Sequence, residues 1–269
     1  MSSAPETAAP RWSVVLCYYN EQDYLPATLA SLMAQDAGPF QLILVDNAST
    51  DGSADICRDV LTGCTDITPV YLHEPRPGKV NALECGLARV DTPFVAFVDA
   101  DTFYPPHYLR RCAEVFDTGP ADAVAVMAIN LDGPPVAGAA LKRQTKKVRK
   151  GRIFDKHCHT GGFGQSFRTD VLRRAGGFSM EHWPYVFEDH EVMQRVHKFG
   201  RSLYDFDLWC VPSDRRSERP SVDWTYFERK LYGLVPFFLL DWYFYRFLGR
   251  RFAARKLGQL NLRQKTWLP

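Results

Sequence analysis

The chain has 269 residues, of which 46% are hydrophobic and 24% are charged, and its formal net charge is +2. This composition is typical of a folded globular protein and excludes a largely disordered chain. Because acidic residues nearly balance the basic ones, the overall charge gives no support for a nucleic-acid partner, and none is predicted.

The seven cysteines are scattered along the chain and include no Cys-x-x-Cys pair. An odd number of dispersed thiols indicates a reducing compartment rather than a disulfide framework or a zinc site. Residues 1–10 are polar and lack the apolar stretch of a signal peptide, so we expect a loose N-terminal tail on a cytoplasmic protein.

From residue 13 to about residue 116, short apolar runs alternate with amphipathic stretches, which is the pattern of a parallel sheet with crossover helices. The first helix is expected to begin near Glu21, because Leu25, Leu29 and Leu32 then share one face. Further helices are predicted after residue 53 and up to Leu87. The predicted strands are 13–17, 42–45, 69–73 and 94–98.

Each of these strands is followed by a polar turn. The turns comprise residues 17–21, 46–53, 76–79 and 99–101. Because the carboxyl ends of parallel strands meet at one edge of a sheet, the four turns are expected to line one crevice.

The most informative turn is Asp99-Ala100-Asp101, which directly follows an apolar strand. Its two carboxylates are hard oxygen ligands of the kind that bind a divalent cation holding a diphosphate. On its own the pattern also fits an ordinary solvated acidic turn.

The sequence after residue 116 contains further predicted strands, helices and turns. A strand is expected at 123–129, and residues 141–156 form a basic helix or loop. The glycines of 161–164 are expected to form a tight backbone passage that a ligand can approach closely. Acidic residues in 187–191 begin a helix, and short strands are predicted near Ser202 and Leu208.

The alternating pattern, the acidic turn after the second strand, the Asp-x-Asp after the fourth and the late Glu188-Asp189 pair resemble, as an ordered set, the family-two glycosyltransferases. The resemblance covers residues 13–216. It implies an α/β fold of the GT-A type, a Rossmann-like, mixed and mostly parallel sheet flanked by helices. We expect this domain to span residues 11–220.

The resemblance also implies a donor site for a nucleotide-diphosphate sugar, with a UDP-sugar favoured. Tyr18 or Tyr19 would stack on the base, and Asp46 would bond the base or ribose, with a plain Asx-turn as the alternative for Asp46. The implied donor-binding residues are Tyr18, Asn20, Glu21, Asp46, Lys79, Asp99, Arg215 and Arg216. For the two arginines a solvated surface pair is nearly as good an interpretation.

By the same resemblance, Asp99 and Asp101 would hold a divalent cation, Mn²⁺ or Mg²⁺, with Asp101 as the direct ligand. The chemical need is plain, because departure of a nucleoside diphosphate leaves extra negative charge on its β-phosphate. Lys79 would add further positive charge there.

In the family the general base is the aspartate of the Glu-Asp pair, so Asp189 is the expected catalytic base, with Glu188 and Glu191 orienting it or the acceptor. A helix N-cap is the alternative for Asp189. A base opposite the leaving group implies one in-line displacement and inversion at the sugar.

Some features depart from the family's patterns. The last histidine, His197, falls inside the helix after the acidic pair, so a downstream histidine ligand is not expected. The Q-x-x-R-W sequence of processive synthases is absent, which favours single sugar addition. His157-Cys158-His159 is not predicted to bind metal, because three adjacent residues do not easily face one ion.

The composition changes in residues 221–269, which are predicted to form a C-terminal helical tail. Residues 222–252 contain twelve aromatic residues with interspersed arginines. This combination fits a peripheral anchor on an anionic membrane at the inner face, and equally fits packing on the catalytic domain or a homodimer interface. The basic run 142–152 fits a lipid-facing surface, a guide for an anionic acceptor, or a solvated helix face.

These features predict a metal-dependent, inverting glycosyltransferase that moves one sugar to a hydroxyl acceptor on a glycan or lipid. A nucleotidyltransferase is the alternative enzyme, although the first βα turn has no glycine to cradle a phosphate. A non-catalytic nucleotide-sugar-binding domain is the alternative without turnover.

Overall fold

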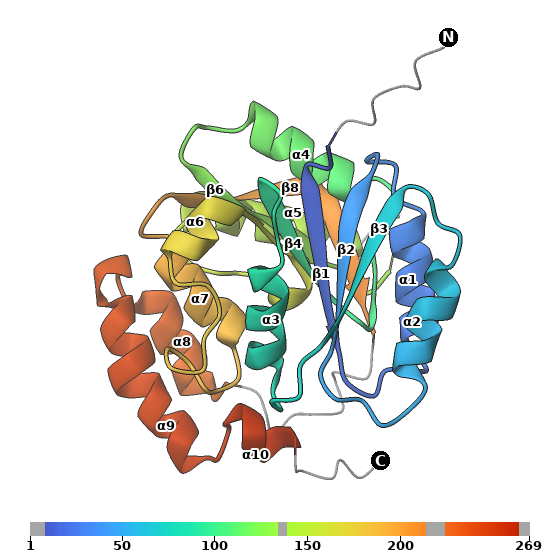
Figure 1. The fold of residues 1–269 in the computed structure, drawn as a ribbon. Coiled ribbons are helices and arrows are strands. Elements are labelled where there is room, and N and C mark those ends of the chain that lie inside the picture. Colours follow the sequence, from blue (N-terminus) through green and yellow to red (C-terminus); the bar gives the residue numbers. More distant parts are fainter. Residues whose placement is uncertain (1–8, 134–138, 214–223, 264–269) are drawn as a thin grey trace.

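The computed structural model describes residues 9–133, 139–213 and 224–263 of the chain (Figure 1). Within these ranges the strands form one eight-stranded sheet of order β3-β2-β1-β4-β7-β6-β8-β5. Helices cover both faces of this sheet, which gives a three-layered α/β domain.

The first half of the sheet is parallel, as the alternating pattern predicts. Its strands are β1 (Trp12–Tyr18), β2 (Phe40–Asp46), β3 (Ile67–His73) and β4 (Phe94–Asp99). The crossover helices are α1 (Leu25–Met33), α2 (Ser53–Leu61) and α3 (Lys79–Ala88). Helix α1 begins at Leu25 rather than near Glu21, with Pro26 in its first turn.

The second half of the sheet is mixed. Its strands are β5 (Thr102–Phe103), β6 (Ala123–Asn130), β7 (Gln165–Arg168) and β8 (Arg201–Pro212). Strand β7 runs antiparallel to both β4 and β6. The prediction of two short strands near Ser202 and Leu208 is wrong, because β8 is one strand whose pairing with β6 shifts register partway along.

The helices that precede residue 213 divide between two cores on the two faces of the sheet. On one face, α1, α2 and α4 (Tyr108–Thr118) pack against strand residues such as Leu16 and Leu44. On the other face, α3, α6 (Thr169–Arg174) and α7 (Glu188–Val196) pack against residues such as Val15 and Phe97. The basic helix α5 (Ala139–Ile153) joins this second core through Val148. The alternating orientation of strand side chains explains both cores.

The C-terminal segment is helical and lies beside α7 (Figure 1). It comprises α8 (Tyr226–Leu234), the 3₁₀ turn η4 (Phe237–Leu239), the π-helix η5 (Trp242–Leu248), α9 (Gly249–Ala254) and α10 (Gln259–Arg263). Its inner face forms a third core that includes Trp224, Tyr243 and Phe252 together with Trp183, which precedes α7. Part of the aromatic excess is therefore explained by packing of the tail on the rest of the chain.

Ion pairs hold the tail together and connect it to the rest of the chain. Within the tail, Glu228 is fully buried and accepts hydrogen bonds from Arg251 and Arg255, 2.7 and 2.9 Å away. Lys198, which follows α7, pairs with Asp241 of the tail at 2.8 Å. Among the described helices, none is both long and apolar enough to cross a membrane. The predicted division at residue 220 remains a prediction.

Candidate active site

The polar turns after the first three strands meet at one edge of the sheet, as predicted. Asn47 connects the turn after β2 with the turn after β3, since its amide nitrogen donates to the carbonyls of Glu74 and Arg76 at 2.9 and 2.8 Å. Its amide oxygen accepts from the Gly78 N–H at 3.0 Å. The carboxyl edge of the sheet is thus a single polar rim.

Asn20 and Glu21 belong to this rim. The Asn20 backbone lies in the left-handed region with φ 53°, and its N–H donates to Ser49 Oγ at 3.1 Å. The Glu21 N–H donates to Ser53 Oγ at 2.8 Å. These contacts hold the first loop against the turn after β2, where the resemblance implies the nucleotide.

Tyr18 does not fit its predicted role as a base-stacking residue. Its ring lies in the core on the α1 and α2 side of the sheet, and burial raises the pKa of its hydroxyl far above the usual value. Tyr19, the other residue considered, is 38% exposed. Of the two rings, only that of Tyr19 is accessible to a base.

Asp46 stabilises its own turn, and it also points toward β3. One carboxylate oxygen accepts from the Ser49 N–H at 2.8 Å, as in the Asx-turn alternative. The other lies 3.2 Å from His73 Nδ1. The side chain sits on the rim, so a donor-binding role for Asp46 remains a prediction.

Lys79 connects three elements at the centre of the rim. It begins α3, and its ammonium lies 2.9 Å from Asp99 Oδ1 at the end of β4 and 3.6 Å from Glu188 Oε1 at the start of α7. Burial raises the pKa of Glu188, and the Lys79 charge opposes that shift. The structure therefore brings Lys79, Asp99 and Glu188 together.

Asp101 lies beside this group and offers a cation two hard oxygens. It is buried, and its Oδ2 accepts a hydrogen bond from Ser213 Oγ at 3.0 Å. Together with Asp99 it supplies the carboxylate donor set that Mg²⁺ or Mn²⁺ binds alongside phosphate oxygens, so these residues fit such an ion. Within the described part of the chain, no group of three or more His, Cys, Asp or Glu side chains could hold a metal alone.

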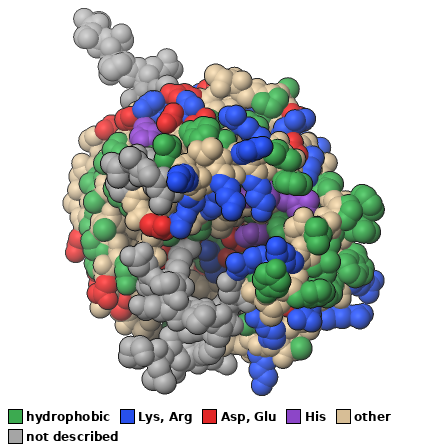
Figure 2. Space-filling model, turned by 180° about the vertical axis from the view of Figure 1, so that it is seen from behind, with side chains coloured by type: hydrophobic (Ala, Val, Ile, Leu, Met, Phe, Trp, Pro, Cys, Tyr) green, Lys and Arg blue, Asp and Glu red, His purple; other side chains and the backbone are tan. Residues whose placement is uncertain are grey.

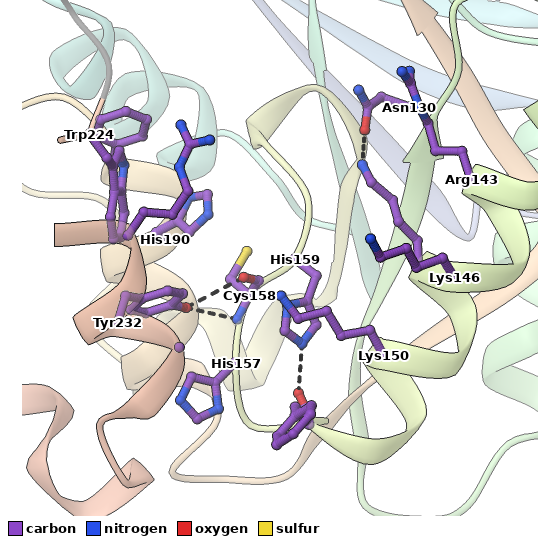
Figure 3. A pocket seen from close by; sticks show the side chains of 15 residues that line it. Asn130, Arg143, Lys146, Lys150, His157, Cys158, His159, His190, Trp224 and Tyr232 are labelled. Atoms are coloured by element: carbon purple, nitrogen blue, oxygen red, sulfur yellow. Dashed lines mark hydrogen bonds between the residues drawn. The ribbon is translucent and has the colours of Figure 1, made fainter. Parts of the chain in front are cut away.

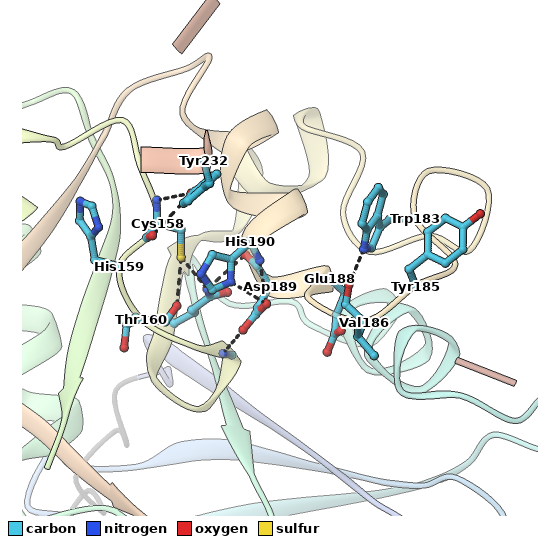
Figure 4. A network of polar contacts seen from close by, with 12 residues as sticks. Cys158, His159, Thr160, Trp183, Tyr185, Val186, Glu188, Asp189, His190 and Tyr232 are labelled. Carbon is cyan, nitrogen blue, oxygen red and sulfur yellow. Dashed lines mark hydrogen bonds and ion pairs between the residues drawn. The ribbon is translucent and has the colours of Figure 1, made fainter. Parts of the chain in front are cut away.

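Asp189 is held by the glycine turn η1 (Gly162–Gly164) and by its neighbour (Figure 4). Its Oδ2 accepts from the Gly162 N–H at 2.6 Å, while its Oδ1 accepts from the His190 N–H at 2.8 Å and lies 3.0 Å from His190 Nδ1. Burial disfavours ionisation, but His190 and then Lys79 outweigh it and lower the pKa of Asp189. Asp189 is therefore a carboxylate at neutral pH.

The glycine turn η1 packs closely against other segments of the protein. A Cβ on Gly162 would lie 3.3 Å from Asp189 Cβ and 3.6 Å from Lys79 Nζ, and one on Gly164 would lie 2.8 Å from Ala128 Cβ. Tyr104 links the turn to the Asp-x-Asp segment, since its hydroxyl accepts from the Asp99 N–H and donates to the Phe163 carbonyl. The glycines permit this close packing.

A cavity of about 700 Å³ opens at the start of α7, and Lys79, Asp99 and Asp101 are not among its lining residues. His190, which contacts Asp189, is part of its wall (Figure 3). Basic side chains of α5 form the facing wall, and aromatic residues Phe187, Trp224 and Tyr232 complete it.

Three predicted residues require comment. Glu191, which is predicted to orient the base or the acceptor, forms a buried ion pair with Arg195, 2.7 Å away, and also accepts from Tyr245. These contacts connect α7 with η5, and the orienting role remains a prediction. Arg215 and Arg216 lie outside the described residues.

Two contacts of the site escape inference from sequence. No sequence motif distinguishes His190 from other helix residues, and only the structure shows that its ring contacts Asp189. Gln259 of α10 accepts from the Lys79 N–H at 3.0 Å and donates to Glu188 Oε2 at 3.3 Å. The tail therefore contacts the rim, although Gln259 is 180 residues distant from Lys79 in the chain.

Comparison with known sequences identifies a family. The profile described as Glycosyl transferase family 2 matches residues 13–176. The minor teichoic acid biosynthesis protein GgaA of Bacillus subtilis is 26% identical over 231 residues, which are 82% of this chain and 51% of that protein. An uncharacterized glycosyltransferase of Nostoc sp. is 35% identical over 116 residues, 43% of this chain and 35% of that protein. The chain thus spans about a third to a half of these relatives.

Solved structures show the same fold. The mannosyltransferase PcManGT from Pyrobaculum calidifontis, in complex with GDP-Man and Mn²⁺, has a TM-score of 0.66 and 22% identity over 81% of this chain and 62% of that chain. Residues 1–349 of Staphylococcus aureus TarS, in complex with UDP-GlcNAc, have a TM-score of 0.60 and 20% identity over 95% of this chain and 76% of that chain.

The mixed sheet, its flanking helices and these likenesses define the chain as a GT-A domain, as the sequence predicts. The profile match covers more than half of the residues, and the chain belongs to glycosyl transferase family 2. The resemblance stated from the motifs is confirmed.

Proposed function

We propose that this protein is an inverting glycosyltransferase that moves one sugar from a nucleotide-diphosphate sugar to a hydroxyl acceptor. The observation that carries the proposal is the placement of Asp189. It is ionised and lies between the Lys79–Asp99–Glu188 group and the cavity next to His190. A base in that position separates a donor side from an acceptor side.

On the donor side, the rim would hold the nucleotide and its diphosphate. Asp46 and Asn20 lie where a base or ribose would be bonded, and Lys79 supplies positive charge to the diphosphate. The solved complexes of PcManGT with GDP-Man and of TarS with UDP-GlcNAc support a nucleotide-sugar donor. We favour a UDP-sugar.

Asp101 and Asp99 would hold a divalent cation, Mn²⁺ or Mg²⁺. Asp101 is the direct ligand in this proposal, because Asp99 already pairs with Lys79. When bound, such an ion stabilises the negative charge that develops on the leaving diphosphate. The Mn²⁺ in the PcManGT complex supports this assignment.

Asp189 would accept the proton of the attacking hydroxyl. A bond forms between the acceptor oxygen and the anomeric carbon while the bond from that carbon to the phosphate oxygen breaks, and the electron pair leaves with the nucleoside diphosphate. One displacement from the opposite face inverts the anomeric centre. The Gly162 N–H and His190 fix the carboxylate for this step.

The test is Asp189→Asn, which preserves the shape of the side chain. We expect calorimetric affinity for UDP with Mn²⁺ to be kept and sugar transfer to fall at least about 100-fold, the low end of a general base's contribution. Asp170→Asn, on α6, is the matched control. Turnover of Asp189→Asn near the wild-type rate would assign the base to another residue, and loss of UDP affinity would place Asp189 in the donor site instead.

The two alternatives make different predictions for the donor. A nucleotidyltransferase would release pyrophosphate, and a non-catalytic binding domain would release nothing, whereas the proposed enzyme releases a nucleoside diphosphate. The ionised Asp189 and the paired Asp99 favour turnover.

We further propose that the enzyme works at the cytoplasmic side of a membrane, on a glycan or lipid acceptor. The outer face of the tail supports this, because Leu234 and Phe238 are 78% and 79% exposed and Lys230 lies one turn before Leu234 on α8. Rings and aliphatic chains at a membrane interface gain from burial, and adjacent basic residues gain from anionic lipid. A homodimer that covers the same face is the alternative.

A further inference from the structure

The cavity beside Asp189 has an unusual charge. Five of its lining residues are lysine or arginine, and among the described lining residues none is acidic. Figure 2 shows Lys and Arg side chains gathered with histidines around a hollow on this face. The cationic lining residues are Arg143, Lys146, Lys147, Lys150 and Arg229.

The lysines of α5 in this cavity have no carboxylate partner among the salt bridges of the described residues. Arg143 pairs with Asp132, which is exposed, and Lys147 donates to the neutral amide of Asn130. Lys146 and Lys150 form no salt bridge with any carboxylate in the described parts of the chain. Burial lowers the pKa of Lys147, which reflects the cost of a charge held there without a counter-ion.

The side chains converge rather than spread. Figure 3 shows Lys146 and Lys150 reaching from α5 toward the wall that carries Trp224 and Tyr232. A solvated helix face would send its ammonium groups outward, away from one another. Like charges that line one cavity repel one another, and a bound anion offsets this repulsion because it attracts each of them.

The cavity adjoins the proposed base through one residue of its wall. His190 lines the cavity, and its Nδ1 lies 3.0 Å from Asp189 Oδ1. Lys79, Asp99 and Asp101 are not among the lining residues. The basic residues of the cavity are therefore distinct from Lys79 and from the proposed metal ligands.

We propose that this cavity binds a phosphate group of the acceptor, so that the acceptor is a phosphate-bearing molecule whose hydroxyl is presented to Asp189. The proposal rests on the proposed function, because it assigns the acceptor of that reaction. A phosphate offers several acceptor oxygens in different directions, which suits lysines and arginines that converge from α5 and α8. The aromatic wall then contacts the carbon skeleton next to the phosphate.

Two sources of phosphate are compatible with this chemistry, a polyol-phosphate chain and a prenyl phosphate. Calorimetry with a soluble oligo(glycerol phosphate) and with farnesyl phosphate in neutral detergent micelles distinguishes them. Oligoglycerol and farnesol in the same micelles are the uncharged counterparts. We expect one phosphate-bearing probe to bind, more weakly at high salt, and its uncharged counterpart not to bind.

The decisive variants are Lys146→Gln with Lys150→Gln, compared with Lys142→Gln and Arg149→Gln. The second pair removes the same charge from the same helix, but neither residue lines the cavity. We expect the first pair to weaken binding of the phosphate probe at least about tenfold and the second pair to leave it within about twofold. Equal losses in both pairs, or equal binding of the uncharged probes, would overturn the proposal.

A donor titration separates this proposal from the proposed function. UDP with Mn²⁺ is titrated into wild type and both double variants. Unchanged UDP affinity alongside the loss of phosphate-probe binding supports a distinct acceptor subsite. If none of UDP, GDP and dTDP binds the wild type with Mn²⁺, the proposed donor site fails, whatever the phosphate probe does. If the Lys146 and Lys150 substitutions weaken UDP binding equally, the cavity belongs to the donor and the acceptor proposal is wrong.

Discussion

The chemistry of the site depends on how a buried carboxylate is kept ionised. Burial alone would raise the pKa of Asp189. The interactions with His190 on α7 and then with Lys79 on α3 outweigh burial, and the Gly162 N–H adds a hydrogen bond. The pKa of Asp189 is consequently lowered, which suits the proposed base.

This arrangement predicts the effect of His190→Gln on the pH profile. Glutamine still offers a donor but no positive charge, so the pKa of Asp189 rises. Because the base acts only when deprotonated, the acidic limb of the kcat profile moves to higher pH. The measurement is the pH dependence of transfer, with His182→Gln, an exposed histidine, as control. An acidic limb that stays in place would show that His190 does not tune the base.

At the residue scale, the sequence predicts the acidic motif residues but not their partners. Asp99, Asp101, Glu188 and Asp189 stand in ordered motifs, and the structure brings them to one edge. The base-stacking role fits Tyr19 better than Tyr18, whose ring is buried. Adjacent strand residues point to opposite faces of the sheet, and the end of a strand does not show in the sequence which of two tyrosines is exposed.

At the element scale, the turn η1 positions Asp189 through backbone rather than side-chain groups. Gly162 donates its N–H to the carboxylate, and Gly164 lies against Ala128 of β6. The glycines of 161–164 predict a close approach of a ligand, whereas the close contacts that the structure shows there are with the protein's own Asp189 and Ala128. The approach of a ligand remains a prediction. The neighbouring strand β7 has only four residues, three of them buried, and shows no alternation that sequence analysis could detect.

We predict that Gly164→Ala destabilises the protein. The new Cβ would meet the Ala128 side chain at 2.8 Å, so β6 or η1 must shift, at a cost of about 1–3 kcal/mol. Chemical denaturation measures the free energy of unfolding. Gly133→Ala is the control, because its Cβ would meet nothing within 4 Å. Equal stability of the two variants would mean that η1 does not pack tightly on β6.

At the scale of the whole molecule, the tail has two faces. The inner face forms the third core with Trp183, and Gln259 reaches the donor rim. The outer face leaves Leu234 and Phe238 exposed. The sequence shows the excess of aromatic residues but not which of them face inward. The helices here are short and include a π-helix, so the aromatic residues do not follow a regular helical period.

The outer face predicts binding to anionic vesicles. We expect the wild type to sediment with anionic vesicles at low salt and less so at high salt, because screening weakens the electrostatic part. Leu234→Glu with Phe238→Glu should reduce sedimentation further. Met33→Glu, on α1 at a distance from the tail, is the control for a new surface charge (Figure 1). A folded, monodisperse wild type that stays in the supernatant would contradict membrane association and favour a subunit interface.

The most direct test of the central claim is thermal stabilisation by nucleoside diphosphates. UDP, GDP and dTDP are each added to the wild type with Mn²⁺, and again with a chelator. A ligand at 100 times its dissociation constant adds about 2.7 kcal/mol to the free energy of unfolding. We predict that one of the three raises the Tm, that the rise requires Mn²⁺, and that Asp101→Ala abolishes it while Asp59→Ala, an exposed aspartate on α2, keeps it. A Tm that none of the three nucleotides changes, or one that rises equally with chelator and in Asp101→Ala, would contradict the account.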